Sequence, residues 1–105
     1  MFDTCYLSLV ADREIDFRNN CFSVDDSRSY SIRGGGTDIY KIKEGTHTIT
    51  ITSGTGAKWT FEEKIRYDQV LTILLGLSGG DICEVSTKIR RSAPMGFGLL
   101  AKKLY

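Results

Sequence analysis

The stretch GTHTITITSGTGAKWTFEEKIRY (Gly45–Tyr67) decides the fold class, because apolar and polar residues alternate along it with a period of two. Successive side chains of a β-strand point to opposite faces of its sheet, so this alternation is typical of half-buried antiparallel strands. Threonines alternate with His47, Ile49 and Ile51 in the first half, and the alternation resumes after the turn SGTGA. The stretch therefore predicts two strands, and places the single histidine of the chain on the same face as two isoleucines.

The rest of the chain has a similar organisation. Strands are expected over residues 4–11, 21–24, 29–33, 37–43, 70–77 and 82–90, with turn residues about every 8–12 positions. Residues 70–77 are apolar on both faces, which indicates a central strand. The pattern predicts an all-β protein, an antiparallel β-sandwich of about seven or eight short strands. At its end, either an extra strand or a short helix is expected, the helix with one apolar face formed by Phe97, Leu100, Ala101 and Leu104.

The length of 105 residues and the distribution of charge indicate one sandwich domain, residues 1–90, followed by a tail, residues 91–105. Residues 1–87 carry nine basic and 13 acidic side chains, a net charge of −4. Residues 88–105 carry five basic side chains and no acidic one. The acidic body argues against a nucleic-acid partner. The basic tail argues for an acidic protein as a partner.

The three cysteines, Cys5, Cys21 and Cys83, are odd in number and widely spaced, without a CxxC pair. With one histidine the chain also lacks the ligand spacing of a zinc site, so neither a metal nor a cofactor is expected. We expect free thiols that act as small apolar residues, with Cys5 and Cys83 facing the core.

Reduced cysteines fit a cytoplasmic location if Met1 is the native start, whereas for a domain fragment the location stays open. The N-terminal residues lack the basic and apolar regions of a signal peptide. No run approaches the roughly 18 apolar residues of a membrane span.

The sequence YKIKEGTHTITIT (Tyr40–Thr52) resembles the glycine–histidine hairpin of PEGA-type domains and of transthyretin-like (carboxypeptidase-regulatory-like) β-sandwiches. The preceding stretch FSVDDSRSYSI (residues 22–32) resembles the hairpin before it, in which an aspartate-rich turn joins two short strands. The resemblance covers residues 22–52. It implies a small sandwich of structural or binding type without an active site. The residues that match the motif are Gly45, His47, Ile49 and Ile51.

His47 is interpreted as structural, together with the turn glycine Gly45. A catalytic imidazole needs a nucleophile or a carboxylate beside it, whereas the periodicity provides isoleucines. A role of His47 as a ligand or a general base is the alternative. Glu63 interrupts the apolar face of its strand, so either this face opens to solvent there or Glu63 pairs with a cation such as Arg33 or His47.

The favoured function is a non-catalytic binding or assembly module. The alternative is a small ligand-binding sandwich that holds a carbohydrate-like ligand in an aromatic cleft formed by Trp59, Glu63 and Tyr67. An enzyme would need two or more titratable groups in one cleft, and the sequence shows none at close spacing.

The tail is the predicted interaction segment, with a second copy or another protein as its partner. A soluble monomer does not leave several large apolar side chains in water, and antiparallel sandwiches have edge strands that need cover. The alternative is that the tail covers its own sandwich. The candidate interaction residues are Phe97, Leu100, Leu104, Arg90, Arg91, Lys102 and Lys103.

Overall fold

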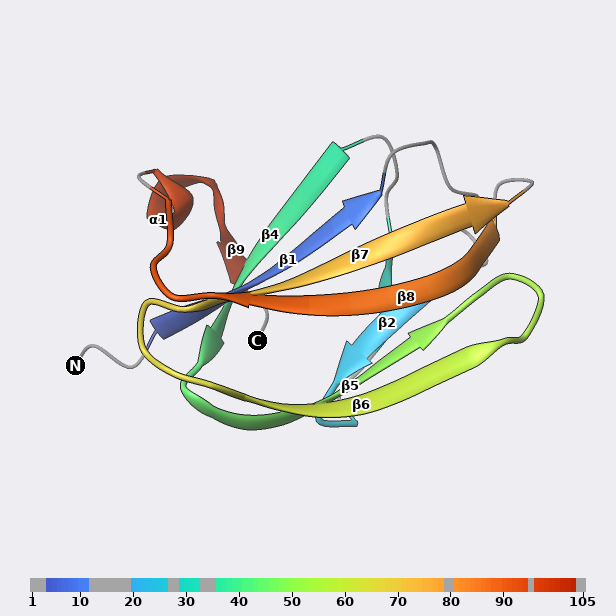
Figure 1. Ribbon diagram of the computed structural model, residues 1–105, viewed down its shortest axis with the longest axis horizontal. Coiled ribbons are helices and arrows are strands. Elements are labelled where there is room, and N and C mark those ends of the chain that lie inside the picture. The colour runs from blue at the N-terminus through green and yellow to red at the C-terminus, as the bar shows by residue number, and fades with distance from the viewer. Residues whose placement is uncertain are drawn as a thin grey trace.

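The computed structural model describes residues 4–11, 20–26, 29–32, 36–78, 81–94 and 96–103. In this part of the chain, nine strands form two sheets (Figure 1). Sheet A has the strand order β8-β7-β1-β4-β9 and sheet B has the order β3-β2-β5-β6. The strands are β1 (Thr4–Ala11), β2 (Cys21–Val24), β3 (Tyr30–Ser31), β4 (Gly36–Lys43), β5 (Gly45–Thr52), β6 (Lys58–Ile65), β7 (Val70–Ser78), β8 (Asp81–Arg90) and β9 (Lys102–Lys103).

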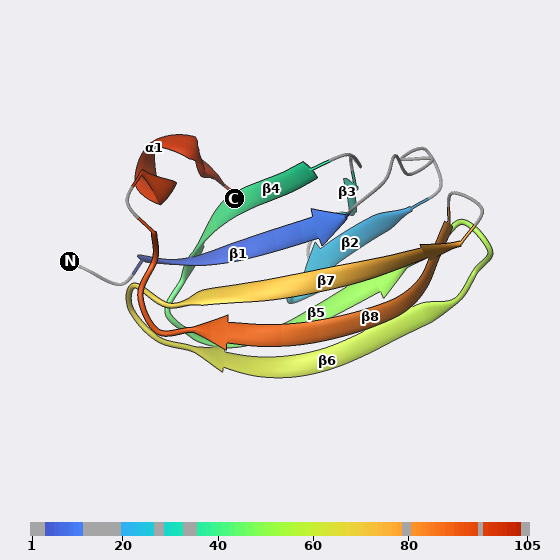
Figure 2. The ribbon, with the colours of Figure 1, turned by 45° about the horizontal axis from the view of Figure 1, so that its top comes forward.

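The two sheets pack face to face as a sandwich, which confirms the predicted fold class (Figure 2). One hydrophobic core contains side chains from both sheets. Leu7 and Leu71 of sheet A and Ile49 and Ile51 of sheet B are all fully buried. They come from the alternating or fully apolar stretches of the sequence, so burial of these faces holds the two layers together.

Two strand pairs are parallel rather than antiparallel, namely β1 with β7 and β4 with β9. Antiparallel neighbours can be joined by a short turn, whereas parallel neighbours need a crossover. Between β1 and β7 the chain passes through the whole of sheet B, which is such a crossover. Local alternation carries no information about this long-range pairing.

The turn at Glu44 and Gly45 is a corner between the sheets and not a hairpin. β4 pairs with β1 and β9 in sheet A, whereas β5 pairs with β2 and β6 in sheet B. Gly45 has φ +138°, a backbone conformation that favours glycine, and this lets the chain change layer at this point. The hairpin implied for residues 40–52 is therefore wrong. The preceding hairpin is confirmed, because β2 and β3 pair antiparallel with Phe22 opposite Tyr30.

A β-bulge near the start of β8 changes which residues face the core. Gly76 lies opposite Glu84 but Leu77 lies opposite Ile82, so Cys83 is the extra residue. Ile82 is consequently buried and Cys83 is exposed. The prediction that Cys83 faces inward is wrong, whereas Cys5 is fully buried as expected.

The end of β6 also differs from the prediction. The strand ends at Ile65, and a turn follows in which Gln69 N–H donates to the Arg66 carbonyl at 3.0 Å. Asp68 adopts a positive φ of 63° within this turn. Tyr67 is therefore a half-exposed turn residue, and does not share the inner face of β6 with Trp59.

The tail returns to sheet A. A single helical turn, α1 (Phe97–Leu100), precedes β9, which pairs with β4 at the edge of the sheet. The ring of Phe97 meets Tyr6 of β1 edge to face, with centroids 5.8 Å apart. The extra strand is thus present, and the helix amounts to one turn of four residues. Within the described ranges, no helix has the length and apolar character needed to cross a membrane.

Candidate binding groove

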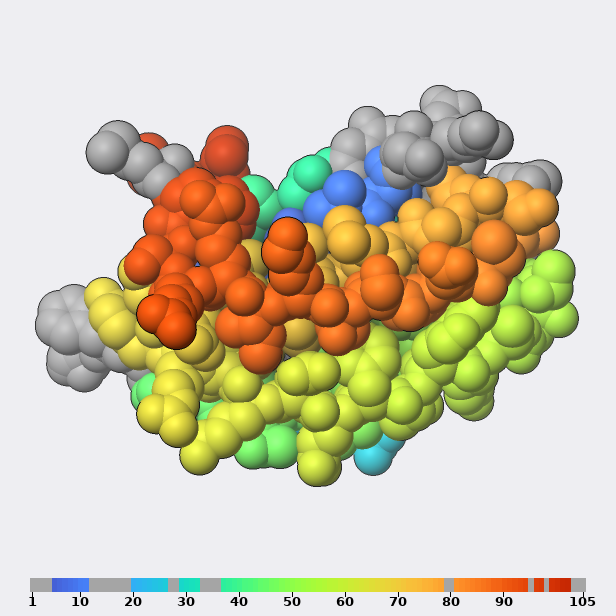
Figure 3. All heavy atoms as spheres, in the orientation of Figure 1, coloured from blue at the N-terminus to red at the C-terminus, as the bar shows by residue number. Residues whose placement is uncertain are grey.

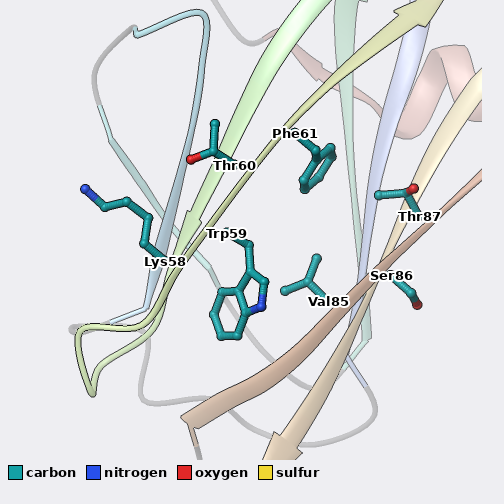
Figure 4. Close-up of a pocket in the computed structure, with 7 residues that line it drawn as sticks. All are labelled: Lys58, Trp59, Thr60, Phe61, Val85, Ser86 and Thr87. Atoms are coloured by element: carbon teal, nitrogen blue, oxygen red, sulfur yellow. The ribbon is translucent and has the colours of Figure 1, made fainter.

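A groove of about 460 Å³ runs between β6 and β8, the edge strands on one side of the sandwich. Figure 3 shows these two strands side by side along one face of the molecule. Trp59, Phe61 and Val85 point into the space between the strands, whereas Lys58 and Thr60 point away from it (Figure 4). The residues that line the groove are Lys58, Trp59, Thr60, Phe61, Val85, Ser86 and Thr87.

The groove exists because the inner faces of both edge strands are incompletely covered. In the ladder between β5 and β6, Phe61 lies opposite Ile49 and Trp59 lies opposite Ile51. The two isoleucines are fully buried, whereas the two aromatic side chains are only partly buried. On β8, Ile89 shares the inner face with Val85 and remains 41% exposed. Apolar surface at this side is therefore left in contact with water.

Charged side chains follow the outer faces of the same two strands. Lys58 and Glu62 lie on the outer face of β6, and Glu84 and Lys88 lie on the outer face of β8. All four side chains are exposed. The groove thus combines an apolar floor with rims that carry both signs of charge.

Of the three residues expected to form an aromatic cleft, the groove contains one. Trp59 lines it, but Glu63 and Tyr67 do not. Glu63 lies opposite His47 in the ladder and is half-buried, and no ion pair joins it to another described residue. Arg33, the other candidate partner, lies outside the described residues.

His47 is held by contacts to both of its ring nitrogens. Nδ1 lies 2.6 Å from Asp25 Oδ2, and Nε2 lies 2.5 Å from the carbonyl oxygen of Lys43. Because a carboxylate and a carbonyl only accept hydrogen bonds, a ring nitrogen that carries a proton donates it to the oxygen beside it. The imidazole is buried, and this arrangement leaves no nitrogen for a metal or a substrate.

Asp25 is fixed by the same arrangement. Its Oδ1 accepts a hydrogen bond of 2.8 Å from the backbone N–H of Thr48. Partial burial by itself raises the pKa of Asp25, but the Thr48 N–H and the His47 ring together outweigh it, so the pKa lies below the ordinary value of 3.8. Both Asp25 and Asp26 have positive φ, as the turn after β2 requires. The carboxylate of Asp25 therefore joins the end of β2 to β5.

The candidate residues of the tail and of β8 do not form one surface. Arg90 and Arg91 lie at the end of β8, at one edge of sheet A, whereas Lys102 lies in β9 at the opposite edge. Lys102 Nζ is 3.8 Å from Asp38 Oδ1, and Phe97 packs on Tyr6. Backbone pairing places Lys103 in β9, and Leu104 lies outside the described residues.

Two leucines of α1 remain in water, Leu99 at 93% and Leu100 at 68% exposure. The tail thus covers its own sheet edge with β9 and leaves part of its apolar surface exposed.

The sequence did not identify Asp25 as the partner of His47, and of the seven residues that line the groove it identified Trp59 alone. The six that were missed are Lys58, Thr60, Phe61, Val85, Ser86 and Thr87. A signal was present in both edge strands. Glu63 and Thr87 are polar residues at inward positions between apolar ones, which indicates a face that is not fully covered. That β6 and β8 lie next to one another depends on the packing of the two sheets, which no local pattern reveals.

In the part of the chain that the structure describes, no three His, Cys, Asp or Glu side chains are grouped so that they could hold a metal ion. No protein-family model matches the chain, and no curated protein is significantly similar to it.

Proposed function

We propose that the chain is a non-catalytic protein-binding module that takes up an extended polypeptide strand along its β6–β8 side. The observation that carries this proposal is the pair of long edge strands with an apolar groove between them. Edge strands present unpaired backbone N–H and C=O groups, which an added strand can bind. The alternate side chains of that strand would then meet Trp59, Phe61 and Val85 in the groove.

The surroundings of His47 support the non-catalytic part of the proposal. Both ring nitrogens are occupied by protein acceptors, so the single histidine of the chain has no free group for proton transfer. The resemblance to PEGA-type and transthyretin-like sandwiches predicts a binding role as well, although residues 40–52 form a corner between the sheets in place of the hairpin of those families. That resemblance remains a prediction, which rests on residues 22–52 of the sequence.

The experiment is a selection from displayed peptides of about 10 residues, the length of β8. Binding is measured by the fluorescence of Trp59, the single tryptophan of the chain, which lies in the groove. We expect selected peptides to alternate apolar and polar residues, and to shift the emission of Trp59 to shorter wavelength. Val85→Lys places a charge in the groove and should abolish binding, whereas the control Leu99→Lys on the tail should bind normally.

Peptides that bind Val85→Lys as well as the unmodified chain would contradict the proposal. Peptides that are lost only with Leu99→Lys would instead assign binding to the tail.

The second candidate function is binding of a carbohydrate-like ligand, which the partly exposed indole of Trp59 favours. Its expected neighbours Glu63 and Tyr67 lie outside the groove, so stacking on Trp59 would have to supply most of the affinity. Titration with a panel of oligosaccharides, measured by isothermal titration calorimetry so that the variant without tryptophan can be compared, tests this candidate. Saturable binding that Trp59→Ala abolishes and Val85→Lys leaves intact would favour it over strand addition.

A further inference from the structure

The two strands that border the groove are the longest edge strands of the described part of the chain. β6 has eight residues and β8 has ten, and each pairs with a neighbouring strand on one side only among the described residues. They end the two sheets on the same side of the sandwich, because one groove is lined by both. A folded partner on this side could therefore extend both sheets at once, whereas a single peptide strand extends one of them.

The sequence of β6 is complementary to itself in one antiparallel register. If a two-fold axis normal to sheet B passes between Thr60 of one copy and Thr60 of a second copy, Lys58 lies opposite Glu62 of the second copy on the outer face. On the inner face, Trp59 lies opposite Phe61 of the second copy. Each copy contributes both members of both pairs, so the contact contains two ion pairs and two aromatic pairs. Such directly opposed pairs stabilise antiparallel sheets.

The other registers of the same kind are unfavourable. Four registers pair at least five residues of β6 with the second copy and place the inner faces of both copies on the same side of the sheet. In these registers the axis lies at residue 60, 61, 62 or 63. An axis at 61 places Lys58 opposite Lys64, an axis at 62 places Glu62 opposite itself, and an axis at 63 places Glu63 opposite itself. Like charges directly opposite one another destabilise a sheet. The register centred on Thr60 is the one of the four without such a pair.

β8 has a comparable arrangement around Ser86. An axis between the two copies of Ser86 places Glu84 opposite Lys88 of the second copy on the outer face, and Val85 opposite Thr87 on the inner face. Ser86 and Thr60 line the same groove, one from each sheet. One two-fold axis normal to both layers, running past Thr60 and Ser86, therefore suits both edges.

We propose that the occupant of the β6–β8 side is a second copy of this chain, so that the protein forms a two-fold dimer in which both sheets continue from one copy into the other. This rests on the proposed function and names its partner. In the dimer, Trp59 and Phe61 of one copy meet Phe61 and Trp59 of the other at the edge of the groove. The exposed apolar surface of both grooves is then removed from water.

The experiment is a charge exchange measured by sedimentation equilibrium of the full chain, from about 1 to about 500 µM. We expect a reversible dimer for the unmodified protein. Lys58→Glu and Glu62→Lys each place like charges opposite one another, and each should weaken the dimer about 10- to 100-fold. The double exchange should restore it. Mixing the two single variants should also restore association, because the mixed dimer pairs two acidic positions with two basic ones.

Lys64→Glu is the matched control, since Lys64 lies on the same face of β6 but outside the paired residues of this register. It should leave the dimer unchanged. Dimerisation strengthened by Lys64→Glu would indicate the register centred on residue 61 and overturn the proposed one. A dimer that neither exchange weakens, or that only Leu99→Lys dissociates, would also overturn the proposal.

A chain that stays monomeric at every concentration would overturn the second copy as the occupant. The proposed function would still stand in that case if selected peptides bind the unmodified chain and not Val85→Lys. The two ideas therefore fail in different experiments.

Discussion

The two sides of the sandwich end in strands of different length. On one side, the short side, sheet A ends in β9 and sheet B ends in β3, and each of these strands has two residues. On the other, the long side, sheet A ends in β8 with ten residues and sheet B ends in β6 with eight. Short edge strands are a common protection against edge-to-edge association. On the short side, the rings of Phe22, Tyr30 and Tyr40 pack together between the sheets. On the long side, Trp59 and Phe61 remain partly exposed.

The difference shows that the chain limits edge-to-edge pairing on the short side with its own short strands, and leaves the edges of β6 and β8 on the long side open to pairing. The tail contributes to the first side, where Lys102 of β9 reaches Asp38 and β9 pairs with β4. If the long side is the binding side that we propose, the same sandwich has one side that contributes mainly to stability and one that serves association. If this comparison is right, equivalent substitutions on the two sides should lower the free energy of unfolding by different amounts.

The largest expected effect comes from a matched pair of phenylalanines in sheet B. Phe22→Ala on the short side should lower the free energy of unfolding by about 3–5 kcal/mol, because the ring is fully buried against Tyr30 and Tyr40. Phe61→Ala on the long side should cost about 1 kcal/mol, because its ring is already partly in water. Urea unfolding at low protein concentration measures both values. Equal costs would remove the contrast between the two sides.

The next effect concerns the tail. Phe97→Ala should lower the free energy of unfolding by about 2 kcal/mol, because it removes a half-buried ring and its edge-to-face contact with Tyr6. Leu99→Ala is the matched control in the same helical turn. At 93% exposure it should change stability by less than about 0.5 kcal/mol. A tail that contributes nothing to the folded state would give two small and equal values.

Most of the core was predictable from the sequence, because burial on alternate positions follows directly from the pleat of a strand. Ile49, Ile51 and His47 are buried as their alternation predicts. The errors have local causes that alternation does not encode. The bulge at Cys83 adds one residue and reverses the faces, and the turn after Ile65 moves Tyr67 off its strand.

The candidate site was predictable only in part, because it depends on long-range pairing. Trp59 was identified by its type and position. That β4 and β5 separate into different sheets at Gly45, and that β6 and β8 become neighbouring edges, is decided by how the two layers pack. The partners of β9 and β1 are likewise set by segments far away in the chain.

A smaller effect is expected at the ion pair that joins β2 to β5. Asp25→Asn should cost about 1 kcal/mol, since it removes a charged hydrogen bond to His47 from a carboxylate that is 41% exposed and screened by water. The pKa of Asp25 in the folded state lies below 3.8, so the contribution of its charge is fully present above pH 3.8 and is lost as the pH falls through the lowered value. Urea unfolding at neutral and acid pH should show less acid destabilisation in Asp25→Asn than in the unmodified chain. An unchanged acid response would mean that the pair does not form.

The smallest change in stability is expected at Cys83, the extra residue of the bulge on the long side. Its thiol is exposed, and Cys83→Ser should change the free energy of unfolding by less than about 0.5 kcal/mol. Cys5→Ser on β1 is the control, since it places a hydroxyl at a fully buried position and should cost about 1–3 kcal/mol.

In thiol labelling of the dilute native protein, Cys83 should react promptly, Cys21 more slowly and Cys5 only after unfolding, because access to the reagent follows exposure. At high protein concentration, pairing of the β8 edges in the dimer should slow the reaction of Cys83 alone. A Cys83 thiol that is protected even in dilute native protein would show that the β8 edge is covered within one chain, and the long side would then be no more available than the short one.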